Sequence, residues 1–400
     1  MRSVSKAVAA AAIASSAALL VAACGSSNSG SSSKLSASQV PQLSYTDFKL
    51  DFSAMAKLKI LASHGSGKIA AILPDTVSST RYVEFDAPYL KKALTDAGLK
   101  ASDQIIQNAQ GSDATEYADA QADITKGAKV LIMDPIDPGV GQKIEAYAKK
   151  QGVPVIDYDR ITLGGSRKYY VSFNNVQVGT LLGQGLESCI TAWKVKSPKV
   201  IVMRGDPTDN NATLFADGYD AVLKSQFSSK AYTDVSNPAG TWTPTTALSE
   251  FQAAYTKNPD ANALLSPNDE NAAPIIHYLQ TKGVKAGTFP VTGQDATLTG
   301  IQNIIAGYQC GTVYKPIYLE AQAAVALAMY LRADITPPSS LVNGSVTDIN
   351  EHAPVQSILE KPEWVTPQTV ESTVVKDGFV PASQICTGAF KADCTKYGIS

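Results

Sequence analysis

Short apolar runs alternate with amphipathic stretches from residue 68 onward. Lys68–Leu73 predicts a buried strand, and Leu90, Ala93, Leu94 and Ala97 then recur at the spacing of a helix that ends at Gly98. The unit repeats, with strands predicted at 104–108, 129–133 and 153–157 and helices at 113–126 and 139–151. Such alternation favours a parallel sheet with helices on both faces, because each crossover must cover a face.

A second series of the same kind follows. It begins with a helix predicted at 175–192 and ends with a long alanine-rich helix at 316–332. Between them lie predicted strands at 199–203, 231–235, 262–266, 289–293 and 311–314 and predicted helices at 211–227, 245–257, 271–282 and 298–306. The stretch from there to about residue 385 contains Pro337, Pro338, Pro354, Pro362 and Pro367, and we interpret it as segments that connect the two halves.

The N-terminus has the layout of a secretory signal peptide over residues 1–23, with Arg2 and Lys6 before an apolar run and small residues at its end. Val21-Ala22-Ala23-Cys24 resembles a bacterial lipobox, so we expect Cys24 to carry lipid and hold the exported protein on the outer face of the cell membrane. The alternative is an ordinary cleaved signal peptide without lipid on Cys24, and the protein would be exported in that case too. Residues 24–67 then comprise the lipidated cysteine, a serine-rich tether and an added segment.

Composition narrows the class of protein. With 44% hydrophobic and 18% charged residues the chain is globular, and its length favours two domains. The formal net charge of −2 gives no electrostatic reason to expect nucleic acid binding.

Four cysteines remain besides Cys24, and disulfides persist in exported proteins. Three pairings are possible. The short segment between Cys386 and Cys394 favours a local pair, which leaves Cys189 with Cys310. A metal site is not expected, because there is no CxxC pair and the chain has only three histidines.

Polar side chains stand where each predicted strand ends, and nearly all are planar or charged. In an open parallel sheet these positions hold ligand groups. Aspartate, asparagine and arginine can each hold two adjacent hydroxyls, as sugars present them, and Tyr82 and Trp242 offer aromatic planes for a sugar's C–H face. Each residue alone could instead cap a helix or turn. The strand-end residues are Asp75, Asp134, Asp137, Asp159, Arg160, Asp206, Asp209, Asn210, Asn211, Asn268, Asp269, Gln294, Asp295 and Lys315.

Catalytic signatures are missing from the sequence. There is no G-x-S-x-G, no H-E-x-x-H and no EF-hand series. Asp134 and Asp137 could serve as a carboxylate pair for glycoside hydrolysis, but their Asp-Pro contexts suit turns. We therefore expect neither an enzyme nor a cofactor.

Several motifs together resemble one family, the periplasmic sugar-binding proteins of type I fold, which are ribose-binding-like, and within it the D-xylose-binding members of bacterial ABC transporters. The resemblance spans Lys68 to Phe379. Its motifs are Asp157-Tyr158-Asp159-Arg160, Val171-Ser172-Phe173-Asn174-Asn175, Asp209-Asn210-Asn211-Ala212, Asn268-Asp269, Gly293-Gln294-Asp295-Ala296, Thr312-Val313-Tyr314-Lys315-Pro316 and Val375-Lys376-Asp377-Gly378-Phe379.

The resemblance implies an α/β fold of two lobes, each a parallel sheet flanked by helices, joined by hinge crossovers. The N-terminal lobe would comprise 68–172 and 316–350, and the C-terminal lobe 173–315 and 351–400. Asp159 and Arg160 would bind sugar hydroxyls from the first lobe and Asn210, Asn211, Asn268 and Asp295 from the second, with Lys315 at the hinge and Trp242 stacked on the ring. Arg81 and Tyr82 would match an Arg-aromatic pair, although Pro74–Thr80 departs from the family pattern.

The implied function is the substrate-binding component of an ABC sugar importer. The two lobes would close on a monosaccharide, and the resemblance favours D-xylose as that sugar. The protein would then deliver the sugar to a membrane permease that has its ATPase on the cytoplasmic side. We expect a monomer that meets the membrane through its lipid anchor alone. There are two alternatives. The same fold could bind glucose or another aldose, or the protein could be a sugar-sensing lipoprotein that signals to a receptor.

Overall fold

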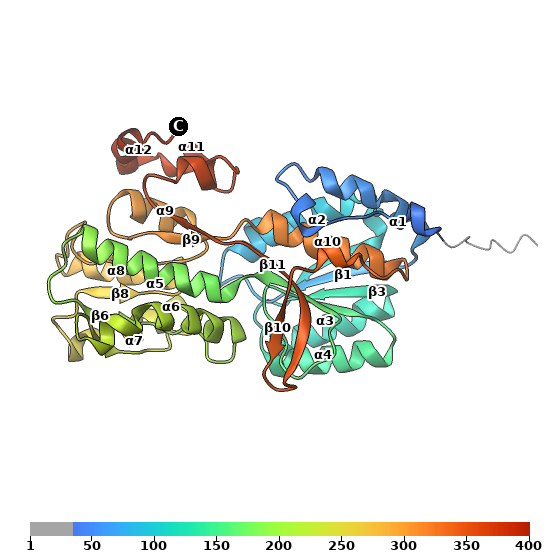
Figure 1. Ribbon diagram of the computed structural model, residues 1–400, viewed down its shortest axis with the longest axis horizontal. Coiled ribbons are helices and arrows are strands. Elements are labelled where there is room, and N and C mark those ends of the chain that lie inside the picture. Colours follow the sequence, from blue (N-terminus) through green and yellow to red (C-terminus); the bar gives the residue numbers. More distant parts are fainter. Residues whose placement is uncertain (1–34) are drawn as a thin grey trace, which may run out of the picture. The chain divides into compact units, whose positions relative to one another are not determined.

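The computed structural model describes residues 35–400, shown in Figure 1. The expected signal peptide at 1–23, the lipidated Cys24 and the serine-rich tether lie outside the described residues.

A seven-stranded sheet forms the first lobe. Its order is β10-β11-β5-β4-β3-β1-β2, and every neighbouring pair is parallel except β10 with β11. The strands are β1 (Lys68–Leu73), β2 (Gln104–Asn108), β3 (Ala128–Met133), β4 (Val155–Tyr158), β5 (Tyr169–Phe173), β10 (Gly344–Asp348) and β11 (Ala353–Glu360).

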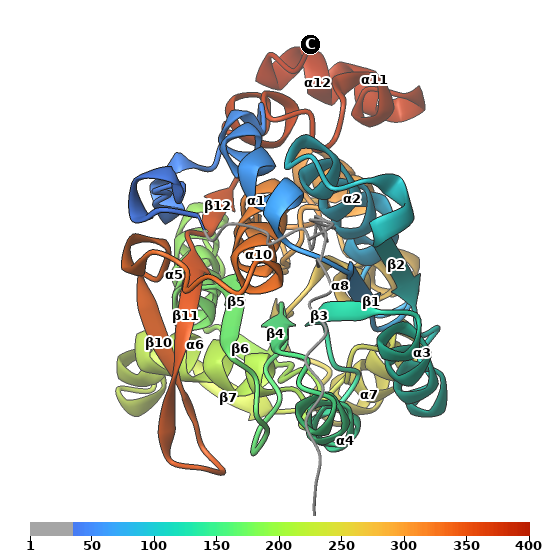
Figure 2. The ribbon, with the colours of Figure 1, turned by 90° about the vertical axis from the view of Figure 1, so that its right-hand side faces the viewer.

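Helices cover both faces of this sheet, as the alternating pattern predicted. Figures 1 and 2 show α2 (Ala87–Asp96) and α10 (Ile317–Arg332) on one face and α3 (Asp113–Thr125) and α4 (Pro138–Lys150) on the other. Side chains of Ser112 and Asp137 accept backbone N–H bonds at the starts of α3 and α4, and so fix where these helices begin. The helix α10 is buried along almost its whole length because it packs on the sheet and under the N-terminal segment.

The second lobe repeats the architecture on a smaller scale. Its parallel sheet has the order β7-β6-β8, from β6 (Lys199–Val202), β7 (Thr233–Ser236) and β8 (Ala263–Leu265). One core joins this sheet to α5 (Asn175–Ala192) and α6 (Asn210–Ser228), and another joins it to α7 (Pro244–Lys257) and α8 (Asp269–Thr281). The strand expected at 289–293 is reduced to a single parallel bridge between Leu264 and Val291, and α9 (Leu298–Ile305) follows it.

Three segments pass between the lobes. The chain leaves the large sheet from β5 into α5, returns from β9 (Thr312–Tyr314) into α10, and leaves again from β11 to β12 (Glu363–Val365), which pairs with β9. Because β11 pairs in parallel with β5, residues 353–360 belong to the first sheet. The lobe boundary expected at 350/351 is therefore wrong for this segment, and the crossover follows Glu360.

The added segment 35–67 is part of the first lobe's core. It contains the short helices η1 (Ala37–Gln39), η2 (Tyr45–Asp47), η3 (Ser53–Leu58) and α1 (Lys59–His64). Met55, Leu58 and Leu61 are fully buried against residues of α2 and α10. The hydroxyl of Tyr330 in α10 donates to the carbonyl of Pro41 at 2.6 Å, which ties the segment to the lobe.

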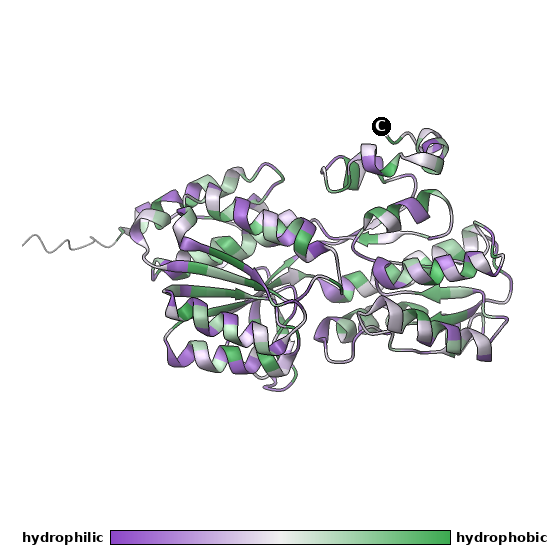
Figure 3. Cartoon of the chain, turned by 180° about the vertical axis from the view of Figure 1, so that it is seen from behind, coloured by the Kyte–Doolittle hydropathy of each residue, from purple (hydrophilic) through white to green (hydrophobic). Residues whose placement is uncertain are grey.

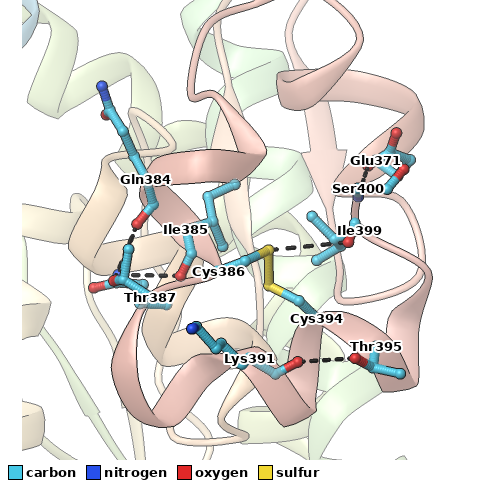
Figure 4. Close-up of a disulfide and its surroundings, with 11 residues drawn as sticks. Glu371, Gln384, Ile385, Cys386, Thr387, Lys391, Cys394, Thr395, Ile399 and Ser400 are labelled. Carbon is cyan, nitrogen blue, oxygen red and sulfur yellow. Dashed lines mark hydrogen bonds between the residues drawn. A yellow bond between two sulfur atoms is a disulfide. The ribbon is translucent and has the colours of Figure 1, made fainter.

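Both expected disulfides are present. Cys189 in α5 pairs with Cys310, and Cys386 pairs with Cys394 in α12 (Lys391–Tyr397). Figure 4 shows the second bridge between α11 (Ala382–Ile385) and α12. Nearby, the backbone N–H of Ser400 donates to Glu371 Oε2 at 3.0 Å. The remaining short helices are η4 (Tyr82–Asp86), η5 (Ala101–Asp103), η6 (Ser339–Leu341), η7 (Glu371–Val375) and η8 (Gly388–Phe390).

Apolar residues concentrate on the strands and on the inner faces of the helices, whereas outer helix faces are polar (Figure 3). Over residues 35–400 no helix has the length and apolar composition needed to cross a bilayer.

Candidate functional site

One cavity collects the strand-end residues of both lobes. It encloses about 340 Å³ of space free of atoms, part of it open to solvent. Nine of the ten predicted ligand-binding residues line it: Arg81, Tyr82, Asp159, Arg160, Asn211, Trp242, Asn268, Asp295 and Lys315. Asn210, the tenth, is buried at the start of α6 but does not line the cavity.

The fold brings most of these residues together because they follow the carboxyl ends of strands, directly or on the loop that comes after. Asp159 and Arg160 come directly after β4, and Lys315 directly after β9. Asn268 caps the start of α8, where its side chain accepts from the backbone N–H of Asn271 at 3.1 Å. Asp159 and Asp295 have positive φ angles of 56° and 89°, a backbone conformation uncommon outside glycine that turns their carboxylates from the sheet edge into the cavity.

Arg81 is the centre of a buried ion network. Its Nε and Nη2 donate to the two carboxylate oxygens of Asp86, both at 2.8 Å, and its Nη1 donates to Asp159 Oδ1 at 2.8 Å. Nη2 also donates to Glu320 in α10. Four of its five N–H groups are thus satisfied by protein carboxylates, so Arg81 holds the first lobe together and has one donor left for a ligand.

Asp159 is fixed from two sides and stays ionised. The hydroxyl of Tyr82 donates to its Oδ2 at 2.9 Å, opposite the bond from Arg81. Burial alone would raise the pKa of Asp159, but the positive charges of Arg81, Lys315 and Arg160 outweigh burial and hold it at about 2. The residue therefore presents a negative charge to the cavity at any physiological pH.

Arg160 is held far more loosely than Arg81. Its Nη2 donates to Ser78 Oγ at 3.1 Å, while its closest carboxylate oxygen, on Asp209, lies 3.6 Å from Nε. Asp134 lies 3.8 Å from Nε, fully buried, and burial raises the pKa of Asp134 well above its ordinary value. The guanidinium also lies 5.6 Å from the ring centroid of Tyr82. Arg160 therefore keeps most of its donors for a ligand.

The second lobe and the hinge contribute an ion pair. Lys315 Nζ lies 3.0 Å from Asp295 Oδ1, and both side chains are buried. Burial would lower the pKa of Lys315, but the charges of Asp295 and Asp159 raise it, so the amine stays protonated. The Lys315 amine and the Asp295 carboxylate thus place a hydrogen-bond donor beside an acceptor at the cavity.

Trp242 supplies an aromatic wall. Its indole N–H donates to Asp209 Oδ2 at 3.0 Å, and its ring packs edge-on to Phe215 at 6.5 Å between centroids. Gly205 makes room for it, because a Cβ there would come within 2.4 Å of the indole, and the φ angle of 86° also favours glycine.

Asn211 joins the two lobes. Its amide N–H donates to the carbonyl of Asp159 at 2.9 Å, and its Oδ1 accepts from Asn175 at 2.8 Å and from the Tyr170 hydroxyl at 3.1 Å. One amide hydrogen remains for a ligand.

Five cavity residues were not among the ten predicted ones: Ser78, Ser79, Asp209, Phe215 and Gln294. Asp209 and Gln294 stand at strand ends that the sequence pattern had identified. Phe215 lies one helical turn after Asn211 in α6, a spacing that places both on one face. The two serines belong to the loop that departs from the family pattern, and no sequence signal distinguishes them.

Comparisons with known proteins identify the family to which the chain belongs. A family profile described as periplasmic binding protein domain matches residues 69–334. The D-xylose-binding periplasmic protein of Escherichia coli is 31% identical over 328 residues, covering 81% of this chain and 94% of that protein. The multiple sugar-binding periplasmic receptor of Rhizobium radiobacter is 30% identical over 336 residues, covering 80% and 92%.

A solved structure shares the architecture. The carbohydrate transporter solute-binding protein of Chloroflexus aurantiacus, in complex with D-glucose, superposes with a TM-score of 0.70 at 27% identity, covering 79% of this chain and 97% of that one.

Proposed function

Because this chain belongs to the periplasmic binding protein family, we propose that it is the sugar-binding component of an ABC importer and that its cavity binds one monosaccharide, D-xylose. The observation that carries the proposal is the cavity itself, which Asp159 and Arg160 line from one lobe and Asp295 and Trp242 from the other. Groups divided in this way can all bind one sugar only when the lobes close on it, so ligand contacts favour the closed state.

Each group has a defined part in this proposal. Arg160 and the remaining N–H groups of Arg81 and Asn211 donate to sugar oxygens, Asp159 and Asp295 accept from sugar hydroxyls, and Lys315 positions Asp295. The indole of Trp242 covers the apolar C–H face of the ring. Selectivity for hydroxyl configuration follows, because a mismatched sugar would leave a buried charge without its partner, which costs about 1–3 kcal/mol.

Delivery and location complete the proposal. The closed protein docks on a membrane permease as a monomer, and the lipid on Cys24 keeps it at the outer face of the cell membrane. A Cys24→Ser variant expressed in a lipoprotein-processing bacterium would then lose the incorporation of radiolabelled palmitate that the wild type shows, and labelling of both proteins alike would contradict the anchor.

The identity of the sugar is tested by calorimetry with D-xylose, D-glucose, L-arabinose, D-ribose and D-galactose, together with tryptophan fluorescence. We expect one-to-one saturation, tightest with D-xylose, and no turnover. The D-glucose complex of the Chloroflexus protein makes D-glucose the second candidate. Tighter binding of D-glucose would assign the protein to that sugar, and binding of none of the five would overturn the proposed function.

A further inference from the structure

The hydroxyl of Ser79 lies between two carboxylates of the other lobe. Its Oγ is 3.1 Å from Asp295 Oδ2 and 3.2 Å from Glu270 Oε1. A serine has a single hydroxyl hydrogen, so it can donate fully to only one of them at a time. Asp295 lines the sugar cavity, whereas Glu270 does not.

Glu270 makes a second bond to the same loop. The backbone N–H of Thr80 donates to Glu270 Oε1 at 3.1 Å, and beside it Asn268 Nδ2 donates to the carbonyl of Ser78 at 3.4 Å. Glu270 is the second residue of α8 and belongs to the second lobe, whereas residues 78–80 belong to the first. All these bonds cross from one lobe to the other and exist only while the lobes are together.

We propose that Ser79, Thr80 and Glu270 form a clasp that couples closure of the lobes to occupation of the sugar site. This inference rests on the proposed function. A sugar that bridges the lobes favours the same closed state that these bonds require, so the bound sugar and the clasp stabilise each other. The clasp is therefore strongest with sugar bound, and Glu270 acts as a positioning residue that never touches the ligand.

The groups around Glu270 determine which chemical property of its side chain the clasp needs. Burial and the neighbouring carboxylates of Asp295 and Asp269 raise the pKa of Glu270 well above its ordinary value, and Lys315 pairs with Asp295 at 3.0 Å. Oε2 of Glu270 is buried without a hydrogen-bond partner. A glutamine at this position keeps an acceptor for Thr80 and Ser79 and, like the neutral acid that the raised pKa of Glu270 favours, carries no charge. Hence the clasp requires an acceptor at Oε1 and does not require the negative charge.

The test compares Glu270→Ala, Glu270→Gln and Val77→Ala with the wild type, using D-xylose in calorimetry and stopped-flow tryptophan fluorescence. Val77 is the matched control, since it lies on the same loop with 62% of its surface exposed. We expect Glu270→Ala to weaken affinity about tenfold, mainly through faster release, because it loses the two hydrogen bonds from Ser79 and Thr80. Glu270→Gln should stay within about threefold of the wild type, and Val77→Ala should match it.

Melting temperatures separate a clasp from a structural role. If Glu270 acts only in closure, Glu270→Ala should melt like the wild type without sugar and gain less than the wild type when sugar is added. Equal affinity and release rate in Glu270→Ala and wild type would overturn the clasp alone. So would an equal fall in both melting temperatures, or a Glu270→Gln protein as weak as Glu270→Ala. A wild type that binds none of the five sugars would overturn the clasp together with the proposed function.

Discussion

The same substitution at two arginines of the cavity should have its main effect on stability in one case and on sugar affinity in the other. Arg81 donates four hydrogen bonds to Asp86, Asp159 and Glu320, whereas Arg160 donates to Ser78 Oγ and to a backbone carbonyl at 3.4 Å. Methionine keeps much of the apolar stem and removes the charge in both. We predict that Arg81→Met lowers stability and that Arg160→Met lowers sugar affinity.

The magnitude for Arg81 follows from what the substitution leaves behind. Removing one partner of a buried ion network leaves carboxylates uncompensated and costs about 3–5 kcal/mol of unfolding free energy. With about 2.1 cal/mol/K of unfolding entropy per residue over residues 35–400, the melting temperature should fall by about 4–7 °C.

The magnitude for Arg160 has a different origin. Its nearest carboxylate contact is 3.6 Å, whereas all four hydrogen bonds of Arg81 go to carboxylates, so removing the guanidinium of Arg160 should cost less stability than the same change at Arg81. Losing charge-assisted bonds to sugar hydroxyls should weaken binding about 10- to 150-fold.

Differential scanning calorimetry without sugar and isothermal titration with D-xylose measure the two effects separately. The reasoning is refuted if Arg160→Met destabilises the sugar-free protein as much as Arg81→Met does. It is equally refuted if Arg160→Met binds as tightly as the wild type.

Three other predictions concern stability. Burial raises the pKa of Glu116 to about 8, so the folded state holds a proton that the unfolded state releases above about pH 4.5. Stability should therefore fall as pH rises from 4.5 to 8. Urea unfolding at both pH values should show a smaller fall in Glu116→Gln than in the wild type, and an equal fall would contradict the prediction, since the raised pKa values of Asp269 and Glu360 act in both proteins. Replacing Cys189 and Cys310 by alanine opens a loop of 121 residues and should lower the free energy of unfolding by about 5 kcal/mol. The same change at Cys386 and Cys394, which are 8 residues apart, should lower it by about 2.5 kcal/mol. Thermal unfolding that ranks the two pairs in reverse would contradict this dependence on loop length. Met55→Ala should cost about 2–5 kcal/mol in urea unfolding because Met55 is fully buried, and the exposed neighbour Lys57→Ala should cost almost nothing.

The sequence pattern predicts the regular elements well where local signals agree. The helix expected at 175–192 is α5 with the same bounds, since the Asn174 side chain accepts from the backbone N–H of Gln177 and an apolar face follows. The first four predicted strands were also found. β1 and β3 are buried apolar runs that begin just after a glycine, and β4 is a buried run that begins just after Pro154.

The segment after residue 337 could not be placed from its own residues. Pro354 was expected to interrupt regular structure, yet it lies in β11 opposite Thr347 of β10. At this point β11 has no partner strand on its other side. The pairing with β5 begins only at Ser357. A proline is tolerated there because no bond of the ladder needs its N–H, and this depends on a partner distant in sequence.

The cavity was predictable to the extent that it follows a rule of the fold. Residues that come directly after strands, such as Asp159 and Lys315, meet at one edge of each sheet. Ser78 and Ser79 lie further along the loop, and they reach the cavity only because that loop crosses to Asp295 and Glu270 of the other lobe. Contacts of this kind depend on how two lobes meet, which no periodicity along the chain encodes.

A crystal structure of the protein grown with D-xylose tests the central claim most directly. We predict one sugar ring between the lobes, with hydroxyls bonded to Arg160 from the first lobe and to Asp295 from the second, and with the indole of Trp242 over its C–H face. A sugar bound to one lobe alone, or outside this cavity, would contradict the account.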